Sequence, residues 1–253
     1  MSNKENNDNM NNPVDIILAT AKGELRNLEM DDNYLIKISV ANSNVIERLI
    51  SNDPNYPFRQ TKEYFLNMWQ QRNGQLTEED CFDIVKKIVK ENSTRTADEY
   101  TKLFAHYMFS TDFFERLANN DIKLVDDMLD NVIASCKAQR IKIRKDKSLA
   151  SKICKYLNEW LYDANVYSIN DSFVRDVLPY YLMIHGVDRK LWIKRNGNKI
   201  KNIDKMKYVE FIGLISKLEE KIAVLDKNKI DHILWYGYRS DPIRCEIAKA
   251  LAR

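Results

Sequence analysis

Apolar residues recur along much of this chain at intervals of three and four, which is the spacing of one face of an α-helix. The clearest helical patterns cover residues 97–109, 120–135, 205–225 and 228–238. A further pattern, in residues 34–50, is ambiguous, because Ile36, Ile38 and Val40 alternate like a strand while the later apolar residues follow a helical spacing. We interpret that stretch as a helix, with a short strand as the alternative.

Several helix starts are marked by capping residues. Thr77 followed by Asp80 resembles a capping box, and Ser240-Asp241-Pro242 places a cap residue before a proline. Pro13 opens an apolar stretch that we expect to form the first helix. These signals, together with the helical periodicity, predict a chain built from a series of helices.

Composition supports the same fold class. The 253 residues include 6 glycines and 5 prolines, too few for the many tight turns of a β-sandwich or barrel. There is no glycine-rich phosphate loop, no dinucleotide-binding G-x-G-x-x-G, no H-E-x-x-H and no G-x-S-x-G. We therefore predict an all-α protein in which any sheet is limited to one short hairpin.

Charge is distributed unevenly along the chain. Residues 1–136 contain 15 Lys/Arg and 23 Asp/Glu, whereas residues 137–253 contain 25 Lys/Arg and 14 Asp/Glu. We expect a disordered tail at 1–12, an acidic helical region at 13–136 and a basic helical region at 137–253. A basic region of this kind fits a polyanionic partner, although solvated lysines on helix surfaces give the same composition.

Cysteine and histidine usage argues against a metal site or a disulfide framework. Cys81, Cys136, Cys154 and Cys245 show no C-x-x-C spacing, and the chain has three histidines. The first twelve residues have no apolar run typical of a signal peptide, and no stretch approaches the length of a membrane span. We expect a cytoplasmic protein with reduced thiols, no cofactor, no bound metal and no membrane partner; its oligomeric state is open.

One segment combines a basic stretch with a helix and a returning loop. Residues 137–155 read KAQRIKIRKDKSLASKICK, with eight basic residues and one acidic residue. A helix is predicted to follow, then a loop at 163–170, and then a new helix that starts at or near Asp171. Twelve helical residues from Lys152 advance about 18 Å, and seven extended residues span at most about 24 Å, so Asp171 is able to return beside Lys152.

The stretch SLASKICKYLNEWLYDANVYSINDSFVRDVL resembles the catalytic segment of the helix-hairpin-helix DNA glycosylases, and is most similar to bacterial 8-oxoguanine DNA glycosylase-like proteins. In that superfamily a hairpin ending in a lysine leads into a helix, and the chain then returns to an aspartate that starts the next helix. Lys152 matches the lysine and Asp171 matches the aspartate. The resemblance implies a helix-hairpin-helix glycosylase-like bundle, with room for two helical subdomains around a cleft.

The same resemblance implies roles for these residues. Lys152, as a neutral amine, attacks C1′ of the deoxyribose and forms a Schiff base, while Asp171 stabilises the positive charge that develops on the sugar. The base leaves the duplex first, so an aromatic pocket is expected, and Trp235 and Tyr238 are the candidates for stacking on it.

Phosphate contacts are expected from the hairpin and its flanks. The family has glycines where this chain has Ser148 and Ala150, so the hairpin backbone differs here. The residues that we expect to contact DNA phosphates are Arg140, Lys142, Arg144, Lys145, Lys147, Ser148 and Ala150. A second basic stretch, residues 189–207, is either a further phosphate-binding loop or a solvated surface turn.

The sequence therefore predicts a DNA glycosylase-like protein that binds duplex DNA and excises a damaged or modified purine, with accompanying strand cleavage as an open possibility. One alternative is a non-enzymatic DNA-binding protein that has kept the fold and lost the hairpin glycines. Another is an interaction protein, for example in phage defence, whose basic half binds protein or RNA.

Overall fold

The structure is a computed structural model, and the residues that it describes are 27–52, 59–91, 96–142, 146–196, 199–201, 203–239 and 242–252. The predicted tail and the helix predicted from Pro13 lie outside these residues.

The described chain is all-α, as predicted. The helices of its first part are α2 (Val40–Asn52), α3 (Arg59–Gln71), α4 (Glu78–Glu91), α5 (Asp98–Ser110), α6 (Phe113–Ala118) and α7 (Leu124–Ala138). Those of its second part are α8 (Lys147–Tyr162), α9 (Ser172–Ile184), α10 (Arg189–Trp192), α11 (Tyr208–Ile222), α12 (Lys227–Arg239) and α13 (Pro242–Leu251). Strands β1 (Lys194–Asn196) and β2 (Lys199–Lys201) form one antiparallel pair, followed by the 3-10 turn η1 (Ile203–Lys205).

The predicted capping box is present at the start of α4. The backbone N–H of Asp80 donates to Thr77 Oγ1 at 3.1 Å, and the N–H of Thr77 donates to Asp80 Oδ2 at 2.9 Å. The ambiguous stretch 34–50 contains both kinds of structure, because Ile36 makes an isolated bridge with Met30 and a helix begins at Val40.

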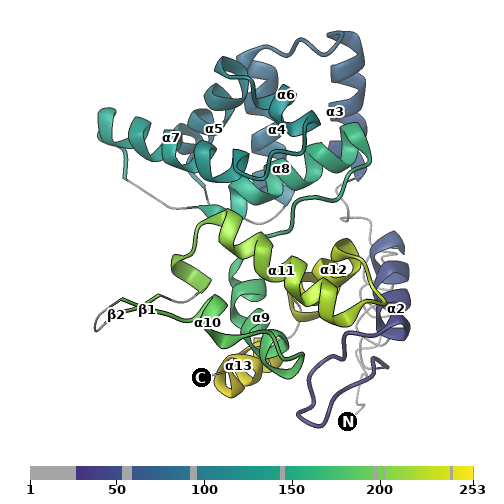
Figure 1. The fold of residues 1–253 in the computed structure, drawn as a ribbon. Helices are drawn as coiled ribbons and strands as arrows, with labels where there is room; N and C mark the ends of the chain where they lie inside the picture. The colour runs from purple at the N-terminus through teal and green to yellow at the C-terminus, as the bar shows by residue number, and fades with distance from the viewer. Residues whose placement is uncertain are drawn as a thin grey trace, which may run out of the picture.

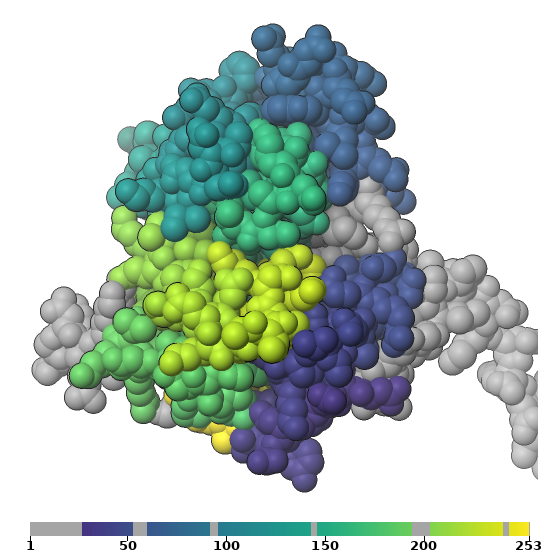
Figure 2. Space-filling model, turned by 45° about the vertical axis from the view of Figure 1, so that its right-hand side comes forward, coloured from purple at the N-terminus to yellow at the C-terminus, as the bar shows by residue number. Residues whose placement is uncertain are grey.

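The helices fall into two groups that meet near the start of α8. Figure 1 shows α3 to α8 in the upper part of the molecule, and α2 with α9 to α13 in the lower part. The contacts agree, since α8 packs on α3, α4, α6 and α7, while α12 packs on α2 and α9. Figure 2 shows the late, yellow-green part of the chain directly beside the purple segment that leads into α2. Helix α11 contacts both α7 and α9, and so links the two groups.

Most of the residues of helix α8, which begins near this junction, are buried. Its apolar residues Ile153, Tyr156, Leu157 and Trp160 are buried, as their spacing predicted. Every residue from Leu149 to Asn158 is buried, so Lys152 and Lys155 lie inside the protein. None of the helices in the described ranges combines the length and the apolar character needed to cross a membrane.

Candidate active site

Lys152 and Asp171 lie beside each other where the two groups of helices meet. Lys152 Nζ is 3.9 Å from Asp171 Oδ2, and each side chain is 7% exposed. Asp171 is the N-cap of α9, and its Oδ1 accepts a hydrogen bond of 3.0 Å from the backbone N–H of Val174. The return of Asp171 to Lys152, expected from the lengths of the helix and the loop, is present in the structure.

Burial sets the ionisation of Lys152. Desolvation is the main cause that lowers its pKa from the ordinary lysine value of 10.5, and the nearby Arg239 lowers it further. The carboxylate of Asp171 acts in the opposite direction, because it favours the ammonium form. The net direction is downward, so the amine is more readily neutral than that of a solvated lysine.

The segment that delivers Asp171 is held by buried hydrogen bonds at three successive residues. The N–H of Ser168 donates to Tyr208 Oη at 2.8 Å, and the N–H of Asn170 donates to Ser151 Oγ at 3.0 Å. Between them, the N–H of Ile169 lies 3.2 and 3.3 Å from the two carboxylate oxygens of Asp231. The backbone before Asp171 is therefore fixed to α8, α11 and α12.

A second lysine–aspartate pair lies one helical turn away from the first. Lys155 Nζ is 3.4 Å from Asp231 Oδ2, with side chains 1% and 0% exposed. Lys155 also donates to Asn228 Oδ1 at 2.7 Å. Sequence reasoning did not single out Asp231. The available signal was its position four residues before Trp235, which places both on one face of α12.

Trp235 and Tyr238, the two predicted stacking residues, have different surroundings. Lys152 Nζ lies 5.8 Å from the centroid of the Trp235 ring, so this ring does border the Lys152–Asp171 pair. Tyr238 is fully buried elsewhere on α12. Its hydroxyl is 2.5 Å from that of Tyr181 and accepts a 3.2 Å hydrogen bond from the N–H of Ile36.

Arg239 is a further cation beside the pair that sequence reasoning did not single out. It is exposed, and its guanidinium carbon lies 5.2 Å from the centroid of the Trp235 ring. Trp235 thus contacts a buried lysine and an exposed arginine. Because an arginine at the end of a helix is common, only its contact with Trp235 distinguishes Arg239 from other surface arginines.

Some of the residues predicted to bind phosphate are exposed, while Lys147 is hydrogen-bonded within the protein. Arg140 and Lys142 are exposed, while Arg144 and Lys145 lie outside the described residues. Lys147 donates to the carbonyl oxygens of Asp204, at 3.0 Å, and Met206. Its ammonium group therefore already donates hydrogen bonds within the protein.

Ser148 and Ala150, which were predicted to lie in a hairpin, lie instead in the first turn of α8, and Ala150 is fully buried. Asp146 caps this helix, since its Oδ1 accepts from the N–H of Leu149 at 3.0 Å, and its carbonyl oxygen accepts from the N–H of Ala150 at 3.1 Å. A carboxylate thus occupies the helix N-terminus, where the resemblance predicted a DNA phosphate.

The second basic stretch has exposed cations before and after the β1–β2 pair in the sequence. Arg189, Lys190, Lys205 and Lys207 are exposed, and Lys207 Nζ lies 3.9 Å from Asp130 Oδ2. No group of His, Cys, Asp and Glu side chains in the described part of the chain is arranged to hold a metal ion.

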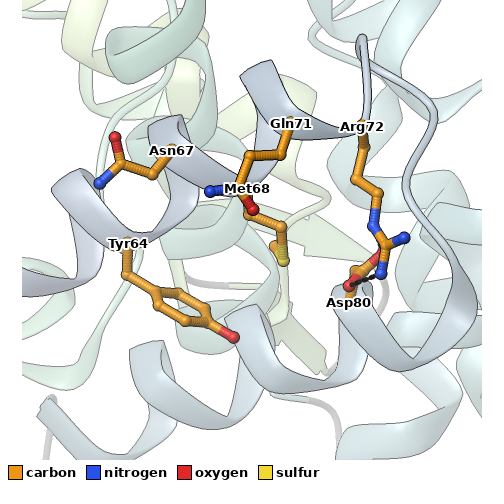
Figure 3. A pocket seen from close by; sticks show the side chains of 6 residues that line it. All are labelled: Tyr64, Asn67, Met68, Gln71, Arg72 and Asp80. Carbon is orange, nitrogen blue, oxygen red and sulfur yellow. Dashed lines mark hydrogen bonds and ion pairs between the residues drawn. The ribbon is translucent and has the colours of Figure 1, made fainter.

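A surface hollow of about 550 Å³ lies elsewhere, between α3 and α4. Figure 3 shows its lining residues, with Arg72 and Asp80 joined by an ion pair of 3.2 Å. The other lining residues are Tyr64, Asn67, Met68 and Gln71. None of the residues predicted from the sequence to act in a site lines this hollow.

Comparison of the chain with protein-family models, curated proteins and solved structures finds no match.

Proposed function

We propose that this protein is a DNA glycosylase-like enzyme that binds duplex DNA and excises a damaged or modified purine. The observation that supports this most is the buried Lys152–Asp171 pair, at 3.9 Å, with the ring of Trp235 beside it. An amine with a lowered pKa next to a carboxylate supplies the nucleophile and the charge stabilisation that cleavage of an N-glycosidic bond requires.

The proposed step uses the neutral form of Lys152. Its Nζ forms a bond to C1′ of the deoxyribose as the bond from C1′ to the base nitrogen breaks. The base leaves with that electron pair and takes up the proton that Nζ loses. Asp171 stabilises the positive charge that builds up on the sugar during this exchange. Opening of the sugar ring then breaks the C1′–O4′ bond, the nitrogen lone pair forms the C=N bond, and O4′ takes a proton from water. The product is a protonated Schiff base between Lys152 and C1′, which borohydride reduces to a stable amine.

Excision requires the nucleotide to leave the duplex, because its glycosidic bond is enclosed in the base stack. Lys152 and Asp171 are each 7% exposed, so the side chains around them also have to move to admit it. Arg239 is an exposed cation in contact with the Trp235 ring, and we propose that it binds a DNA phosphate next to the extruded nucleotide. The exposed Arg140 and Lys142 supply further charge for the DNA backbone.

The arrangement at the start of α8 favours a second candidate, a DNA-binding protein without glycosylase activity. The Asp146 side chain and carbonyl already accept the N–H groups of Leu149 and Ala150, so these two groups are not free for a phosphate. An enzyme with this feature has to take its phosphate contacts from side chains instead of from the backbone N–H groups of Leu149 and Ala150.

Borohydride trapping on a panel of lesion-containing duplexes tests the proposal. The expected result is a covalent adduct between the wild-type protein and at least one lesion duplex, together with release of the free base. Binding of duplex DNA without release or trapping on any lesion supports the non-enzymatic candidate. Neither binding nor release on any duplex contradicts both.

A further inference from the structure

Asp231 is a fully buried carboxylate whose contacts converge on the segment that carries Asp171. Its side chain on α12 is 0% exposed, and its oxygens meet Lys155 Nζ at 3.4 Å and the N–H of Ile169 at 3.2 and 3.3 Å. Ile169 precedes Asp171 by two residues. Asp231 therefore joins α8, which carries Lys152 and Lys155, to the backbone that ends at Asp171.

The Lys155–Asp231 ion pair does not by itself explain why a carboxylate is buried at this position. A buried ion pair is often replaced by apolar side chains of similar volume with no loss of stability. The amide of Ile169 is different, because a buried N–H without an acceptor costs about 1–3 kcal/mol. Asp231 supplies that acceptor, and Lys155 supplies the opposite charge that keeps the carboxylate in place.

We propose that Asp231 is a positioning residue, which holds the Ile169 backbone so that the Asp171 carboxylate faces Lys152. Lys155 is its counter-ion. Any effect on catalysis rests on the proposed glycosylase function, whereas the geometric effect on Asp171 and Lys152 does not. Asp231 acts through the backbone of residues 169–171, so it is not itself expected to touch the substrate.

Two matched double variants separate the hydrogen bond from the ion pair. Both carry Lys155→Met, which removes the buried cation while keeping an unbranched side chain. One adds Asp231→Asn, whose amide oxygen still accepts from the N–H of Ile169. The other adds Asp231→Leu, which has no acceptor. Neither variant leaves an unpaired charge at this position, and circular dichroism and thermal unfolding check that both fold.

If the proposed function holds, kcat of the Lys155→Met/Asp231→Leu protein falls on the order of 100-fold, since a misplacement of about 1 Å has effects of that size. KM for DNA stays near the wild-type value, because the phosphate contacts are unchanged. The Lys155→Met/Asp231→Asn protein keeps a kcat close to that of the wild type. Equal kcat values in two folded double variants would overturn the positioning role.

A titration of Lys152 tests the geometry without any activity. In protein labelled at the lysine side chains, the pKa of Lys152 is expected to be lower in the Asp231→Leu double variant than in the Asp231→Asn double variant, because Asp171 moves away and no longer favours the ammonium form. Amide hydrogen exchange at residues 169–171 is expected to be faster in the Asp231→Leu double variant. Identical titration and exchange in the two variants overturn the inference, even if the wild-type protein excises no base. Different titration in a protein without excision activity supports the inference and contradicts the proposed function.

Discussion

Lys152 and Asp171 are joined through one carboxylate oxygen, while the other oxygen of Asp171 serves a different partner. Oδ2 lies 3.9 Å from Lys152 Nζ, and Oδ1 accepts the 3.0 Å hydrogen bond from Val174 that caps α9. The cap and the ion pair are thus separate functions of one side chain. A substitution that keeps the acceptor and removes the charge is able to distinguish them.

Asp171→Asn is expected to lower the rate of base excision sharply while leaving DNA affinity unchanged. The amide still caps α9, so the change in the cap contributes less than about 1 kcal/mol to the free energy of unfolding. In the proposed mechanism this substitution removes the charge that stabilises the developing positive sugar, an interaction made only in the transition state. Single-turnover excision and DNA binding measure the two effects.

Asp188→Asn is the matched control for this substitution. Asp188 caps α10 in the same way, since its Oδ1 accepts from the N–H of Lys190 at 2.9 Å, and it is exposed. The Asp188→Asn substitution should leave the rate of base excision unaltered. Full excision activity in Asp171→Asn would mean that this aspartate serves only as a helix cap.

Lys152→Ala is expected to abolish the borohydride-trapped adduct, because it removes the amine that we propose forms the Schiff base. Binding of duplex DNA should remain, since the exposed cations proposed to contact phosphates are unchanged. Lys217→Ala is the control, because Lys217 is an exposed lysine on α11 paired with Glu220. An adduct of normal yield in Lys152→Ala would show that another amine is the nucleophile.

The pH dependence of trapping should follow the lowered pKa of Lys152. In the proposed step only the neutral amine attacks. The trapping rate therefore rises with pH through the pKa of Lys152 in the folded protein and levels off below pH 10.5. In the window between the folded and unfolded pKa values the unfolded chain binds more protons, so the free energy of unfolding rises with pH there. Urea unfolding across this window should show the rise in wild type and a smaller one in Lys152→Met. A trapping rate that still rises with pH above pH 10.5 would contradict the lowered pKa of Lys152.

Tyr238 and Trp235 should respond differently to substitution. Tyr238→Phe removes a buried hydroxyl that bonds to Tyr181 and Ile36, so we expect a stability loss of about 1–3 kcal/mol with excision activity retained. Trp235→Leu changes the wall beside Lys152, and we expect excision to fall more than DNA affinity. Thermal unfolding and single-turnover excision measure both. Loss of excision in a folded Tyr238→Phe protein would restore a direct role for Tyr238.

Lys142 and Lys147 provide a matched test of the phosphate contacts. Lys142→Glu is expected to weaken binding to any duplex sequence and to reduce the slope of log affinity against log salt by about 0.9, because one lysine–phosphate interaction is removed. Lys147→Gln should mainly reduce stability, because its ammonium already bonds to the carbonyls of Asp204 and Met206. Combining Lys142→Glu with charge reversal at Arg144 and Lys145 should weaken binding further. Unchanged affinity after all three reversals would exclude this segment from the DNA interface.

The sequence by itself determined the features that depend on neighbouring residues. Helix periodicity gave the buried face of α8, and the Thr77–Asp80 capping box marked the start of α4. The length of one helix and one loop was enough to bring Asp171 back to Lys152. Helix α6 was missed because its six residues are too few to show a period. Helix α3 was missed although Phe65, Met68 and Trp69 follow a helical spacing, so its signal was present in the sequence.

Only the tertiary structure decided which polar residues are buried and which partners they meet. Asp231 contacts Ile169 across 62 residues of sequence, and Tyr238 contacts Ile36 across 202. No local pattern encodes such contacts, since they form when helices from distant parts of the chain pack together. The same packing encloses Lys155 and gives Trp235 and Tyr238 different surroundings on one helix. Periodicity predicts which face of a helix is apolar, but the neighbouring elements determine what that face contacts.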